Sequence, residues 1–147
     1  MRYAALAMLV CTAISGALIL GAWLTRSEVR RARVRHGRHR RLPPALVFGH
    51  VTLALITAAA WTTFVFVGSH GLATSAVALL AVTATLGATM FVRWIPTYRS
   101  HSAALDGPGA AHRASRATNL PIRVVLAHGA FAIATATLAT FVLLTNR

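Results

Sequence analysis

Four long apolar runs restrict the fold of this chain more than any other feature of its sequence. They cover residues 3–24, 44–67, 72–92 and 122–145, and no charged residue lies well inside any of them. At about 1.5 Å per helical residue, each run can cross the roughly 30 Å hydrocarbon core of a bilayer. The runs mix Leu, Ala, Val and Thr without strict alternation, which favours helices over barrel strands. The sequence therefore predicts an all-α integral membrane four-helix bundle.

The overall composition excludes several other classes of protein. Hydrophobic residues make up 56% of the chain and charged residues 12%, whereas a soluble domain carries about a quarter charged residues. The single cysteine, Cys11, can form neither an intramolecular disulfide nor a metal cluster. The first run is long and is followed, not preceded, by its arginines, so we expect a mature helix and not a signal peptide. One membrane domain covering residues 1–147 is predicted.

The distribution of arginine predicts the orientation. The formal net charge of +13 comes from 15 arginines. Eight of them lie in residues 26–41 and five in residues 93–123, which leaves only Arg2 and Arg147 for the opposite side. The positive-inside rule then places both connecting segments in the cytoplasm and both termini outside a multi-pass protein of the cell membrane. Segment 26–41 could also bind anionic lipid headgroups. No nucleic-acid partner is expected, since no aromatic residue interrupts this segment to stack on bases.

The second half of the chain repeats the first. An offset of 78 positions aligns the second run with the fourth, and an offset of 71 aligns the first run with the third. The change of offset reflects a longer second connection, in which residues 100–117 are predicted to be a flexible linker. Two helical hairpins of one orientation should be related by a pseudo-twofold axis along the membrane normal. The rarest matches are Gly16/Gly87, Trp23/Trp94, Pro43/Pro121 and His50/His128.

The matched residues also share helical faces. Around each histidine they recur at i−7, i−3, i+4 and i+7, which places them on one side of a helix. Small residues form similar stripes on the first and third runs, and such stripes let membrane helices approach closely. We therefore expect the repeated faces to point towards the axis. The pattern leaves open whether the hairpins close on each other or form a homo-oligomer with a second copy.

His50 and His128 are the only histidines inside the four runs. Each follows a proline, Pro43 or Pro121, by 7 residues, so both should lie at one depth, about 10 Å into the membrane. Ionisable groups inside a membrane are costly and are functional candidates by default. Two imidazoles on inward faces at equal depth could reach one central object from opposite sides.

The object that two nitrogen ligands would suit best is haem iron. Zinc would require three or four protein ligands, whereas the macrocycle of haem supplies four and leaves two axial positions. Gly49 and Gly129 flank the histidines, and Gly16 and Gly87 lie at similar depth on the other runs, where missing side chains would make room for the ring. No Cys-x-x-Cys-His motif occurs, which implies non-covalent haem b. Alternatively, each histidine hydrogen-bonds a hydroxyl or carbonyl group and only fixes helix packing.

Histidines on the second and fourth helices of a bundle resemble the arrangement in membrane-embedded cytochromes b. The resemblance rests on His50 and His128 and implies that both ligate one haem. Two histidine ligands leave no open iron position, which favours electron transfer to or from a quinone or a partner protein over self-contained enzyme chemistry. The alternative is a cofactor-free membrane interaction protein, or an accessory subunit of a larger complex, that docks through segment 26–41.

Overall fold

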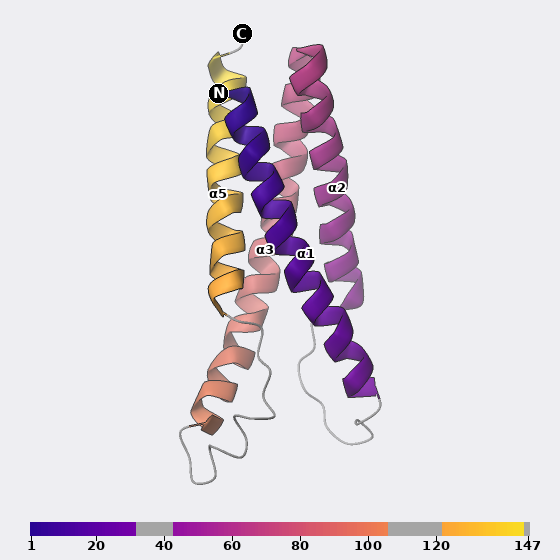
Figure 1. Ribbon diagram of the computed structural model, residues 1–147, viewed down its shortest axis with the longest axis vertical. Coiled ribbons are helices and arrows are strands. Elements are labelled where there is room, and N and C mark those ends of the chain that lie inside the picture. The colour runs from indigo at the N-terminus through magenta and orange to yellow at the C-terminus, as the bar shows by residue number, and fades with distance from the viewer. Residues whose placement is uncertain (32–42, 106–121, 146–147) are drawn as a thin grey trace.

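The chain folds into four antiparallel α-helices (Figure 1). The structure, a computed structural model, describes residues 1–31, 43–105 and 122–145, and it describes side-chain surroundings in these ranges except at 26–31 and 96–105. By length and composition, all four helices can cross a membrane, so the prediction of a helical, multi-pass membrane protein is confirmed at this level. The helices are α1 (Arg2–Arg31), α2 (Pro44–Val67), α3 (His70–Leu105) and α5 (Ile122–Thr145).

Two helices have the predicted bounds and two are longer. α2 and α5 coincide with the second and fourth apolar runs, whereas α1 continues to Arg31 and α3 to Leu105. The predicted linker was therefore wrong over residues 100–105, which are helical. Hydropathy marks only the part of a helix that suits lipid. α3 continues through Pro96, and no further glycine or proline follows before its end at Leu105.

Local sequence explains how α2 begins and ends. Pro44 occupies the first turn, where its missing N–H leaves no hydrogen bond unmade. At the other end, Gly68 has a φ of 73° and donates its N–H to the carbonyl of Phe64 at 2.8 Å. This left-handed conformation favours glycine, because a Cβ would be strained there. The cap lets the chain turn directly into α3.

The expected hairpins are α1–α2 and α3–α5, but the larger contacts join helices of different hairpins. α1 has its most extensive contact with α5, and α2 with α3, while the α1–α2 and α3–α5 contacts are smaller. Among the described residues, the backbones of α1 and α3 do not come close to each other, nor do those of α2 and α5, so these pairs occupy the diagonals of the bundle. α1 and α3 end, and α2 and α5 begin, at what we call the loop end; the opposite end, with Arg2 and Thr145, is the terminal end (Figure 1).

The apolar core fills only the half of the bundle near the terminal end. Its largest members are Trp61 and Phe64, which are 3% and 1% exposed and whose ring centroids lie 5.0 Å apart. From the histidines to the loop end, Val47 is the one buried apolar side chain among those described. The core cluster comprises Ala5, Leu9, Trp61, Phe64, Val65, Ala73, Ala76, Ala139 and Val142.

The outer surface of the bundle is apolar. Large hydrophobic side chains on all four helices point away from the core, including Leu18, Leu55, Val82 and Ile133, each more than half exposed. A water-soluble protein rarely exposes apolar surface on this scale, whereas lipid tails solvate it without cost. The surface thus agrees with the length of the helices in indicating contact with a lipid bilayer.

Candidate functional site

His50 on α2 and His128 on α5 meet in the middle of the bundle. Their ring centroids are 6.4 Å apart and their planes are inclined by 76°. Because α2 and α5 are diagonal to each other, the rings meet across the centre of the bundle and not along a helix–helix seam. The structure therefore brings together the two imidazoles that the sequence analysis singled out.

Each imidazole is oriented by a backbone carbonyl of a neighbouring helix. His50 Nδ1 lies 3.1 Å from the carbonyl oxygen of Thr83, and His128 Nδ1 lies 3.0 Å from that of Thr12. A carbonyl oxygen can only accept, so Nδ1 must carry the hydrogen and donate it. In the neutral rings Nε2 is then the unprotonated nitrogen. Within the part of the chain that the structure describes, neither Nε2 has a hydrogen-bond partner.

Two of the predicted glycines allow the rings to lie against the helix backbone. A Cβ on Gly16 would come within 3.0 Å of Cε1 of His128, and a Cβ on Gly87 within 3.2 Å of Cε1 of His50. Both distances are shorter than ordinary carbon contacts. These glycines therefore make room for the imidazoles themselves. We had expected them to make room for the haem macrocycle.

The other two predicted glycines have no such contact. A Cβ on Gly49 or Gly129 would meet no other group within 4 Å. Although both are adjacent in sequence to a histidine, they lie outside the close contacts that hold the rings.

Four threonines, three of them buried and Thr12 half-buried, form a second layer beside the histidines. Thr12 Oγ1 lies 3.2 Å from Thr135 Oγ1, and Thr57 Oγ1 lies 3.4 Å from Thr83 Oγ1. Each hydroxyl also donates its hydrogen to the carbonyl four residues earlier in its own helix. A hydrogen bond between the two hydroxyls of a pair is therefore a second bond made by a hydrogen that already bonds a carbonyl. Thr12 and Thr83 thus each make two contacts at the site. The backbone carbonyl accepts a hydrogen bond from a histidine, and the side-chain hydroxyl contacts another threonine.

Each half of the site is completed by the other hairpin. His50 belongs to the first hairpin and rests on Thr83 and Gly87 of α3, while His128 belongs to the second and rests on α1. This exchange follows from the packing of α2 on α3 and of α5 on α1. Neither hairpin contains a whole half-site.

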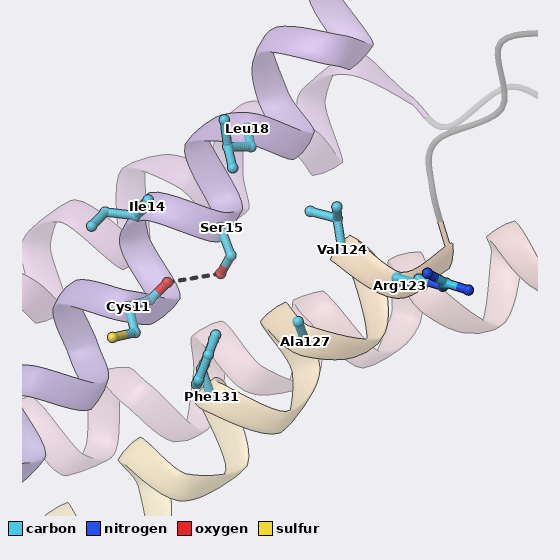
Figure 2. A pocket seen from close by; sticks show the side chains of 8 residues that line it. All are labelled: Cys11, Ile14, Ser15, Leu18, Arg123, Val124, Ala127 and Phe131. Carbon is cyan, nitrogen blue, oxygen red and sulfur yellow. Dashed lines mark hydrogen bonds between the residues drawn. The ribbon is translucent and has the colours of Figure 1, made fainter.

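Ser15 makes the surroundings of His128 different from those of His50. Its Oγ lies 3.1 Å from His128 Nδ1 and donates to the carbonyl of Cys11 at 2.9 Å (Figure 2). The position offset by 71 residues is Leu86, which has no polar atom in its side chain. The sequence analysis missed Ser15 because a search for repeated residues discards every position that differs between the halves.

The other expected ligand surface lies outside the described residues. The backbone of residues 26–31 continues α1, but their side chains and residues 32–41 are not described. Binding of anionic lipid or of a partner by segment 26–41 remains a prediction.

His50 and His128 come together at this centre without a third side chain of a metal-ligating type among the described residues. Among the described residues, no group of three or more His, Cys, Asp or Glu side chains could hold a metal ion by itself. Any metal held here would have to bring its remaining ligands with it. No family model matches this chain, and no curated protein or solved structure matches it.

Proposed function

We propose that the protein is an integral membrane cytochrome of the b type, which holds one haem b between His50 and His128 and exchanges electrons with a quinone or a partner protein. The observation that carries the proposal is the state of the two rings. Both donate Nδ1–H to a carbonyl, so both Nε2 lone pairs are available at the centre of the bundle.

The spacing of the rings fits a shared metal ion. An imidazole nitrogen binds a metal at about 2 Å, so two rings on opposite sides of one ion have centroids about 6 Å apart. The observed separation is 6.4 Å. A metal-bound histidine almost always donates its other N–H to a carbonyl or carboxylate, which fixes its orientation. Both rings have this partner, as ligation requires; a role in packing alone would show the same hydrogen bonds, so the spectrum described below decides between the two.

Haem would supply one-electron chemistry at this centre, together with four of the six iron ligands. His50 and His128 would supply the other two and leave no position open for a substrate. The carbonyls of Thr12 and Thr83 hold the ring planes in place. Electron transfer follows as the function that these residues serve best.

The packing of the bundle supports a single haem. Between the histidines and the terminal end, the interior is filled by the core around Trp61 and Phe64. Between the histidines and the loop end, Val47 is the one buried apolar side chain described. A flat apolar group is therefore excluded from the half that the core occupies, which leaves the loop side of the histidines for it.

We also propose that the two hairpins are a duplication with both termini outside the cell membrane. The duplication is supported by contacts that occur twice at the sequence offsets: histidine to carbonyl, histidine to glycine and threonine to threonine. The orientation is supported by the concentration of arginine in segments 26–41 and 93–123.

An absorption spectrum tests the haem assignment. The protein is purified from cells supplied with a haem precursor, and the spectrum is recorded before and after reduction by dithionite. We expect a Soret band and sharp reduced α and β bands of low-spin haem b at one haem per chain, and none in the double variant H50A/H128A. A wild-type preparation without haem under these conditions would contradict the proposal and leave the accessory subunit as the better account.

A further inference from the structure

α1 and α5 enclose a groove on the side of the bundle next to His128 (Figure 2). Its volume is about 400 Å³, which falls in the range of about 300–1,000 Å³ that holds small molecules. Its walls are mainly apolar, and Ser15, at the back, is only 7% exposed. Its lining includes Ile14, Ser15 and Leu18 of α1 and Arg123, Ala127 and Phe131 of α5.

The groove is elongated along the helices. Its lining extends over residues 11–18 of α1 and 123–131 of α5, which correspond to about 10–12 Å of helix. The hydroxyl of Ser15 is engaged by Cys11 and by His128. The groove walls therefore offer an occupant a long apolar surface with almost no free hydrogen-bonding group.

One end of the groove carries a positive charge. Arg123 is the second residue of α5, at the loop end, and its side chain is exposed. The only two acidic residues of the chain, Glu28 and Asp106, lie where no side chains are described. A complementary occupant therefore has a chain parallel to the helices and a negative group at the loop end. A phospholipid in the leaflet on that side of the membrane has this shape, orientation and charge.

We propose that this groove binds one acyl chain of an anionic phospholipid, whose phosphate pairs with the guanidinium of Arg123. The site stands apart from haem binding, because none of its features depends on a cofactor. The opposite side of the bundle lacks the same chemistry, since the positions offset by 78 from Arg123 and Phe131 are Ala45 and Leu53. One lipid per chain is therefore expected, held behind His128.

Native mass spectrometry of the full chain tests the proposal, with phosphatidylglycerol or phosphatidylcholine added to the detergent micelles. We expect one phosphatidylglycerol to remain on the wild-type protein and phosphatidylcholine to be retained at least tenfold less. Arg123→Gln removes the charge and Ala127→Phe fills the groove, so each should reduce retention of phosphatidylglycerol at least tenfold. Arg93→Gln is the matched control. It removes an exposed arginine of α3 that also lies towards the loop end of the bundle, and it should leave retention unchanged.

Four results would overturn the proposal. Equal retention of both lipids would show that the phosphate–arginine contact does not select the occupant, and so would equal losses in Arg93→Gln and Arg123→Gln. Retention in Ala127→Phe, with an unchanged helical circular-dichroism spectrum, would place the lipid elsewhere. A bound species with the mass of a quinone would identify a different occupant.

Discussion

The surroundings of His50 and His128 are alike where they touch the ring and different behind it. Both rings donate Nδ1–H to a threonine carbonyl, at 3.1 and 3.0 Å, and both face a glycine whose Cβ would come within 3.2 or 3.0 Å. Only His128 has a serine hydroxyl, at 3.1 Å, as a second acceptor. The groove with Arg123 also lies on this side.

The comparison separates the contacts that position an imidazole, which occur at both rings, from the contact that occurs at one ring only. A carbonyl acceptor and a helix backbone without a Cβ occur at both rings, so these two features suffice to fix the ring. The serine occurs at one ring only, so it is not needed for placement and can instead make the two nitrogens unequal. Four predictions test this distinction.

Removing either histidine has the largest expected effect. If both rings are ligands, His50→Ala and His128→Ala each remove one of the two protein bonds to iron, and each single variant should lose the low-spin spectrum completely. His70→Ala is the control, since His70 is exposed at the start of α3 and its replacement should leave the spectrum intact. A normal low-spin spectrum in either single variant at position 50 or 128 would remove the ligand assignment.

The four glycines should divide into two classes. Gly16→Ala and Gly87→Ala force a methyl group against an imidazole, and overpacking of this kind costs about 1–3 kcal/mol. Gly49→Ala and Gly129→Ala meet open space and should be neutral or stabilising by up to about 1 kcal/mol, because alanine favours helix. Thermal unfolding in detergent, followed by circular dichroism, measures the difference. Equal destabilisation of all four variants would show that the glycine contacts do not distinguish the positions.

The serine should affect the electronic properties of one ring without displacing it. Its extra bond to Nδ1–H makes the imidazole of His128 a stronger electron donor, which stabilises oxidised iron. Ser15→Ala should therefore raise the midpoint potential of the bound haem, as measured by redox titration. Leu86→Ser places a hydroxyl at the equivalent position behind His50 and should lower it. Shifts of the same sign in both variants would contradict this account.

The threonine pairs should contribute least. Thr135→Val and Thr57→Val each remove one hydroxyl from a pair, and polar contacts between membrane helices are worth about 0.6 kcal/mol on average. Thr63 is exposed and bonds only the carbonyl of Ala59, so Thr63→Val serves as the control and should be neutral. Unfolding in detergent resolves the effect if the paired variants are compared with this control. A loss above about 2 kcal/mol would mean that the hydroxyls do more than share a contact.

Much of the fold could be predicted from hydropathy alone. The bounds of α2 and α5 coincide with apolar runs because α2 begins at a proline and ends before a glycine, and because a proline precedes α5. The ends of α1 and α3 could not be predicted in this way. Their last turns are largely polar, and hydropathy reports solvent preference and not backbone conformation.

The candidate site was predictable only where the two halves agree. Matching offsets singled out His50, His128, Gly16 and Gly87, and the structure brings these four together. The carbonyl acceptors could not be found from sequence, because every residue has a carbonyl and only packing decides which one a ring meets. Gly49 and Gly129 were included because of their place in the chain, whereas their side of the helix faces no neighbour.

The exchange of contacts between hairpins bears on how such a chain could arise. A protein with a single hairpin would carry a histidine without the carbonyl that it bonds. It could assemble the centre only as a dimer of identical chains. Every substitution would then appear on both sides of the dimer. Under the proposed duplication, joining the two copies in one polypeptide would remove that restriction. Ser15 and Arg123, which have no counterparts in the other hairpin, would then be changes that only the joined form could acquire on one side.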